Sequence, residues 1–138
     1  MKKLRLSILL LGCIQGTDAN NILISNVAKA SDNAAQDYAI IRFDISWENS
    51  WRDAINYDAA WIFVKFRAQG STNAWSHASL HISGHIGPAG STIQTPADGK
   101  GIFIYRSANG SGNVSYSSVE LRWDYGVDGM ADNAGIDI

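Results

Sequence analysis

The chain has 138 residues, of which 46% are hydrophobic and 17% are charged, and its formal net charge is −2. This length fits one domain, the apolar fraction excludes a disordered chain, and 13 glycines interrupt any long helix. The negative charge argues against a nucleic-acid-binding module, and no run of about 20 apolar residues is present that would span a membrane.

Residues 1–19 have the three parts of a secretory signal peptide. A basic start, Met1–Arg5, precedes an apolar stretch, Leu6–Ile14. Thr17-Asp18-Ala19 then provides small residues for cleavage before Asn20. We therefore expect a protein that is secreted or held at the cell surface.

Cys13 offers an alternative, because Leu10-Leu11-Gly12-Cys13 resembles the lipobox of a lipoprotein signal. A third interpretation is an ordinary buried strand or helix at the N-terminus. Cys13 is the only cysteine, so a mature domain of residues 20–138 would contain neither a disulfide nor a thiol nucleophile.

Strand patterns dominate the rest of the chain. Residues 40–47 and 118–125 alternate apolar and polar side chains, which predicts half-buried strands. Their predicted core faces are Ile41, Phe43, Ile45, Trp47, Val119, Leu121, Trp123 and Tyr125. Residues 59–66 are apolar on both faces, which predicts a central strand covered on both sides. Weaker strands are predicted over residues 21–28, 75–83, 101–106 and 135–138.

Turn-rich segments separate these strands, and residues 48–57 and 88–96 are predicted as long loops. About seven short strands with glycine-rich turns predict an all-β fold, an antiparallel β-sandwich that is immunoglobulin-like or jelly-roll-like. The alternation that begins at Ile136–Ile138 is typical of a strand cut short, which favours a fragment of a longer chain.

His77, His81 and His85 are spaced by four residues. In a strand, positions i and i+4 lie about 13 Å apart, at about 3.3 Å per residue. Zinc ligands must approach one ion within about 2.1 Å. We therefore expect an exposed polar face here and no shared metal.

Asp124, Asp128 and Asp132 lie in a glycine-containing loop and are a weak calcium candidate. Their spacing differs from that of an EF-hand, and turn-forming aspartates are the favoured interpretation. No cofactor is expected.

Catalytic patterns are weak. Ser, His and Asp are all present, but the Gly-x-Ser-x-Gly elbow of a hydrolase is missing. Glu48 and Glu120 could serve as a glycosidase pair, but Glu120 stands beside Arg122 on a polar strand face, where an ion pair or solvation is expected. No catalytic residue is assigned, and a small extracellular enzyme is the least favoured alternative.

Five tryptophans are the remaining signal. Trp47, Trp61 and Trp123 stand on apolar faces and are expected in the core. Exposed aromatic rings can stack on sugars or anchor a protein partner. The candidates for such ligand binding are Trp51, Tyr57, Trp75 and Tyr105.

Several segments resemble one known family; they are Ile45–Arg52, Tyr57–Phe66, Ser83–His85, Thr95–Arg106 and Leu121–Gly126. They are similar to the N-terminal region of secreted Bacteroidetes-type proteins of the formylglycine-generating-enzyme (sulfatase-modifying factor) family. The likeness covers nearly all of residues 20–138.

In that family the catalytic domain, with its metal-binding cysteines, follows the region that is matched here. The resemblance therefore implies a non-catalytic accessory module that packs against a downstream catalytic domain or a cell-surface protein. A carbohydrate-binding module with a glycan as its ligand is the alternative.

Overall fold

The computed structural model describes residues 20–138, so the predicted signal peptide and Cys13 lie outside the described part. All regular structure in this part is β-strand, and every strand pair is antiparallel. The predicted all-β, antiparallel sandwich class is confirmed. None of residues 20–138 belongs to a helix with the length and apolarity needed to cross a membrane.

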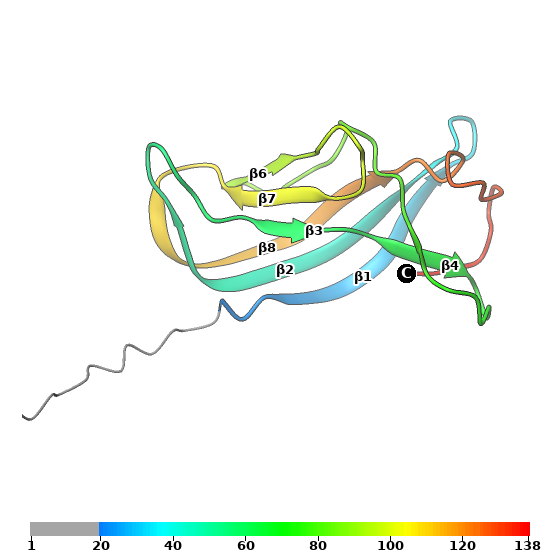
Figure 1. The fold of residues 1–138 in the computed structure, drawn as a ribbon, viewed down its shortest axis with the longest axis horizontal. Helices are drawn as coiled ribbons and strands as arrows, with labels where there is room; N and C mark the ends of the chain where they lie inside the picture. Colours follow the sequence, from blue (N-terminus) through cyan, green and yellow to red (C-terminus); the bar gives the residue numbers. More distant parts are fainter. Residues whose placement is uncertain (1–19) are drawn as a thin grey trace, which may run out of the picture.

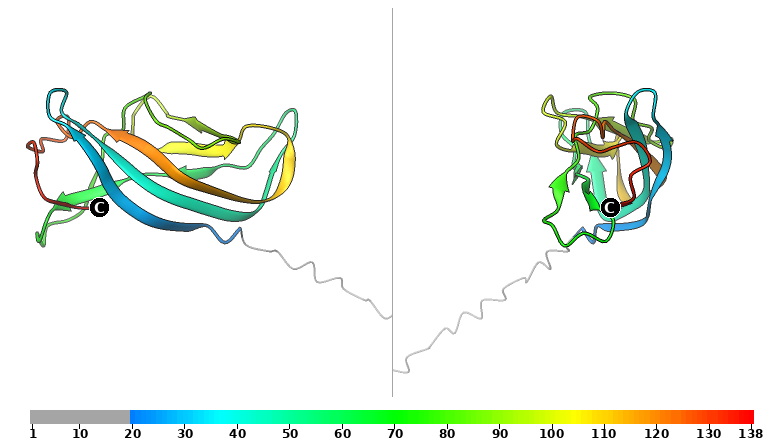
Figure 2. Two further views of the ribbon diagram at one scale, coloured as in Figure 1. Left: turned by 180° about the vertical axis from the view of Figure 1, so that it is seen from behind. Right: turned by 90° about the vertical axis from the view of Figure 1, so that its right-hand side faces the viewer.

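One layer consists of three long strands in the order β1-β2-β8 (Figures 1 and 2). Their bounds are Leu23–Asn33 for β1, Tyr38–Arg52 for β2 and Gly110–Trp123 for β8. The two alternating segments meet in this sheet, where Ile41 lies opposite Leu121. Each side chain of their predicted core faces is at most 4% exposed, which confirms the alternation.

The second layer packs over this sheet and consists of two smaller sheets. The first has the order β3-β7-β6, with the bounds Ala60–Ile62, Ile102–Arg106 and Ser91–Gln94. The second has the order β5-β4-β9, with the bounds Ser76–His77, Lys65–Ala68 and Ile136–Asp137. Ile102 and Ile104 of β7 are fully buried and join the core residues of β2 and β8.

The prediction of one central strand over residues 59–66 is wrong. The segment is divided between β3 and β4, and β3 lies at the edge of its sheet. Ala60, Val64 and Phe66 enter the core, whereas Trp61 and Phe63 are 41% and 46% exposed. Trp61 is therefore not a core residue, although it was expected there.

Other boundaries also differ from the expectation. β2 continues to Arg52, into the predicted loop 48–57, and β6 lies within the predicted loop 88–96. The predicted strand 75–83 shrinks to β5, and Ile82, near the end of the predicted strand, is 66% exposed. The described part consequently has nine strands instead of about seven.

The strand edges on the two sides of the sandwich differ in whether other backbone segments cover them. The outer edge of β8 is covered by the segment before β6, where Ile86 and Glu120 exchange two backbone hydrogen bonds of 2.9 and 2.8 Å. His81 donates its backbone N–H to the carbonyl of Arg122 on the same edge. On the opposite side, β1 pairs only with β2, and β3 only with β7, within residues 20–138. The sandwich is closed along β8 and open between β1 and β3.

Candidate functional site

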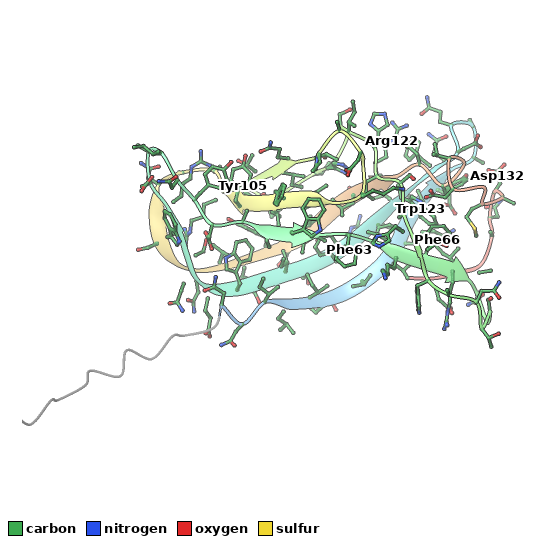
Figure 3. All side chains as sticks on the ribbon, in the orientation of Figure 1. Phe63, Phe66, Tyr105, Arg122, Trp123 and Asp132 are labelled. Atoms are coloured by element: carbon green, nitrogen blue, oxygen red, sulfur yellow. The ribbon has the colours of Figure 1, made fainter. Side chains whose placement is uncertain are left out.

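The open side of the sandwich is an apolar groove of about 590 Å³. β1 lines one wall, and β3 with the residues that lead into β4 lines the other. The buried side chains of Ile41 and Phe43 on β2 lie at its base. Phe63 projects from the segment between β3 and β4 (Figure 3). We call this hollow the β1–β3 groove; its remaining lining residues are Ile22, Ile24, Val27, Trp61, Ile62, Val64, Lys65, Trp75 and Ile138.

Large apolar side chains of this groove are exposed to solvent. Ile22, Val27 and Phe63 each keep about half of their surface accessible, at 56%, 47% and 46%. β1 contributes because it is exposed along nearly its whole length. Folded soluble domains rarely expose a contiguous apolar surface, and where one occurs it usually marks a site that binds a ligand or a partner protein.

Aromatic contacts hold the walls of the groove in place. The ring of Trp61 packs on Phe103 of β7, with centroids 4.6 Å apart. Phe63 packs on His77 of β5 at 5.3 Å. The Arg67 guanidinium lies 4.5 Å from the ring centroid of Trp75. Neighbouring side chains thus fix the groove side chains in position without a ligand, so the binding surface is preorganised.

The four residues predicted to bind a sugar do not form one surface. Trp75 lies in the groove, beside β4. Trp51 lies near the far end of β2, and strand alternation turns its side chain to the opposite face from Arg52. Only Tyr57 and Tyr105 meet, with stacked rings whose centroids are 4.3 Å apart.

The Tyr57–Tyr105 pair is engaged within the protein. The Arg52 guanidinium lies 5.0 Å from the ring centroid of Tyr57 and 5.4 Å from that of Tyr105. Tyr105 is only 8% exposed, and burial raises the pKa of its phenol. This cluster can stabilise the end of the sandwich, but one face of the exposed Tyr57 ring is already occupied by Tyr105.

The three histidines fall on different structures. His77 lies in β5, whereas His81 and His85 lie in the segment that covers the edge of β8. His85 accepts the backbone N–H of Arg122 at Nδ1, 3.0 Å away, and its Nε2 lies 2.7 Å from the His81 carbonyl. His85 thus has a structural position, and burial is the main cause that lowers its pKa.

The three aspartates of the calcium hypothesis each have a separate partner. Asp124 pairs with Arg122 at 2.8 Å, and Asp132 accepts the Tyr125 hydroxyl at 2.9 Å. Asp128 accepts hydrogen bonds from Ser79 and Trp123. Within residues 20–138 no three His, Cys, Asp or Glu side chains form a group that could hold a metal.

Glu120 forms an ion pair, but not with the neighbour that the sequence suggested. The Glu120 carboxylate pairs with the guanidinium of Arg42 on β2, with 2.6 Å between Oε1 and Nη2, while Arg122 pairs with Asp124. The reason is register, because Arg42 lies directly opposite Glu120 in the sheet.

Sequence reasoning missed the groove, although two signals pointed to it. One is the run of apolar residues on both faces of 59–66, and the other is the apolar run Ile22–Ile24, which leads into β1. Comparison with known proteins adds no relative, since no family model, curated protein or solved structure matches the chain.

Proposed function

We propose that this chain is a non-catalytic interaction module that binds an extended apolar segment of a partner protein in the β1–β3 groove. The observation that carries the proposal is the groove itself, in which exposed apolar side chains stand between two unpaired strand edges. The resemblance described above supports a non-catalytic role, because the matching region precedes the catalytic domain in that family.

The chemistry of the groove favours a polypeptide over a glycan. Sugar hydroxyls need polar partners at fixed positions, and among residues 20–138 Lys65 is the only charged side chain that lines the groove. Apolar side chains of a peptide would instead bury the exposed surfaces of Val27 and Phe63.

Peptide display on the immobilised protein tests the proposal. We expect panning to enrich peptides rich in Val, Ile, Leu and aromatic residues. Their affinity should fall by about tenfold or more in Phe63→Asp and in Val27→Asp, because each places a charge against apolar ligand atoms.

Ile55→Asp is the matched control. Ile55 is 84% exposed and lies outside the groove lining, so this variant should bind the enriched peptides like the parent protein. Equal affinity of all variants, or binding to a glycan array without peptide binding, would refute the proposed function. Circular dichroism of each variant shows whether its fold is retained.

A further inference from the structure

The two strand edges that flank the groove run in the same direction. β2 is antiparallel to β1, and the chain then returns through β3, so β1 and β3 both run from left to right in Figure 1. Their backbone N–H and C=O groups on the groove side have no strand partner within residues 20–138. One added strand that is antiparallel to β1 would therefore be antiparallel to β3 as well.

That direction already occurs at one end of the groove. β9 is antiparallel to β4, with Arg67 opposite Asp137, and β4 continues the course of β3. Ile138 directly follows β9 and lines the groove. The backbone at this end therefore shows that an antiparallel strand can lie beside the β3–β4 wall.

One charged side chain of the described residues, that of Lys65, also lines the groove. Lys65 lines it, and within residues 20–138 it is not among the cations that form ion pairs. Lys65 is exposed and stands next to the buried Phe66, so its ammonium can reach the outward side of an added strand. An acidic residue would complement it there.

We infer that the occupant of the β1–β3 groove is a β-strand of a partner protein, added antiparallel to both β1 and β3, with alternate apolar side chains in the groove and an acidic residue beside Lys65. This inference rests on the proposed function and specifies the partner. Strand addition uses main-chain hydrogen bonds for affinity and side-chain pockets for selectivity.

The probe is a capped eight-residue peptide that alternates valine and threonine, with one glutamate in place of the first threonine. Its partner probe has the same side chains but carries N-methyl groups on alternate backbone nitrogens, which removes hydrogen-bond donors. One alternate set of nitrogens would face β1 and the other would face β3. We therefore expect N-methylation of either set to weaken binding by about tenfold or more, since several hydrogen bonds are lost.

The direction of the bound probe relative to β1 is measured by NMR, with a spin label on its N-terminus in one sample and on its C-terminus in another. In the antiparallel arrangement the N-terminal label broadens the amide signal of Val27, and the C-terminal label broadens that of Ile22. Lys65→Glu should weaken the glutamate probe by up to about fivefold and favour a probe with lysine at that position.

The outcomes separate the two proposals. Binding of the panned peptides with no loss on N-methylation, or with the opposite label pattern, overturns strand addition but leaves the proposed function intact. Failure of the panned peptides and the probe to bind overturns both. Sedimentation is measured in parallel, and a dimer that Phe63→Asp dissociates would make a second copy the occupant and refute the inference.

Discussion

The indole Nε1 of Trp123 donates a hydrogen bond of 2.6 Å to Oδ2 of Asp128. The same carboxylate accepts the backbone N–H of Ser79 at 2.7 Å and the Ser79 hydroxyl at 2.6 Å. Trp123 is 1% exposed, so water cannot replace this acceptor. Asp128 therefore joins the end of β8 to the segment that covers the edge of β8.

An equivalent arrangement stands at the other end of the core. The indole of Trp47 donates to Asp58 at 2.9 Å, and Asp58 also accepts the Ser50 hydroxyl at 3.1 Å and the backbone N–H of Trp51 at 2.9 Å. Each of the two buried tryptophans thus has a carboxylate as its partner.

Asp128→Ala should lower the free energy of unfolding by about 2–3 kcal/mol, because a buried indole N–H loses its acceptor together with two further hydrogen bonds. Asp128→Asn keeps one carbonyl oxygen and should lose less. Urea denaturation with an unchanged m value measures both.

Asp98→Ala is the control for this pair, because Asp98 is exposed and, within the described part of the chain, its side chain accepts only the nearby backbone N–H of Lys100. We expect its effect to stay within about 0.5 kcal/mol. If Asp128→Ala changed stability no more than this control, the carboxylate would have no role in holding the two segments.

The sequence predicted the core of the large sheet well and the open side poorly. Alternation at residues 40–47 and 118–125 is a local property of a strand with one buried face, so Ile41 and Leu121 were placed correctly. In residues 59–66 the same rule failed, because a run that is apolar on both faces does not show whether its second face is covered by the protein or left open. Trp61 and Phe63 lie on the open face.

The roles of the acidic residues depended on contacts that a single strand does not reveal. Asp128 is expected in a turn, and its hydrogen bonds to Ser79, 49 residues away, exist because the segment around Leu80 lies beside the end of β8. Similarly, Glu120 pairs with Arg42 across 78 residues of chain because of the β2–β8 register. Such partners are fixed by topology rather than by spacing.

Gly101→Ala should destabilise the protein by about 1–3 kcal/mol through overpacking. A Cβ at this position would lie 2.6 Å from Cζ2 of Trp61 and 2.8 Å from the carbonyl oxygen of Ile62. The Trp61 ring lines the groove, so its displacement should also reduce peptide binding.

A double-mutant cycle separates these two contacts. In a Trp61→Ala background the ring is gone, and the loss caused by Gly101→Ala should shrink to that of the Ile62 carbonyl contact. An equal loss in both backgrounds would show that the ring does not contribute.

Protonation of His85 at low pH should weaken the contact between the edge of β8 and the segment that covers it. A carbonyl can only accept, so His85 donates from Nε2 to the His81 carbonyl and accepts the Arg122 N–H at Nδ1, which requires the neutral ring. Burial is the largest influence on His85 and lowers its pKa, while the hydrogen bond to the His81 carbonyl and the charge of Asp124 act in the opposite direction. The charges of the His81 ring and of Arg122 add to the lowering.

The lowered pKa sets the pH window. Above the ordinary histidine pKa of about 6.5 the ring is neutral in both states, and below it the unfolded chain binds a proton that the folded chain resists. Stability should therefore fall as the pH drops below about 6.5. His85→Gln should reduce this slope, and His77→Gln, at an exposed position, should preserve it. A slope that follows His77 instead would contradict this assignment.

Tyr125 should be the last tyrosine to ionise as the pH rises. Burial is the main cause that raises its pKa to about 12, and the hydrogen bond of 2.9 Å from its hydroxyl to Asp132 adds to the effect. Since the folded-state pKa lies above the ordinary value of about 10, the stabilisation is complete below pH 10 and is lost as the pH rises towards 12. Absorbance of the tyrosinate form measures this titration.

Two variants test the cause of the shift. Tyr125→Phe should remove the step at highest pH, while the steps of Tyr105 and Tyr116, whose pKa values burial also raises, stay in place. Asp132→Asn should move the Tyr125 step to lower pH, because a neutral amide no longer holds the proton on the phenol. If the highest step persisted in Tyr125→Phe, the late titration would belong to another buried tyrosine.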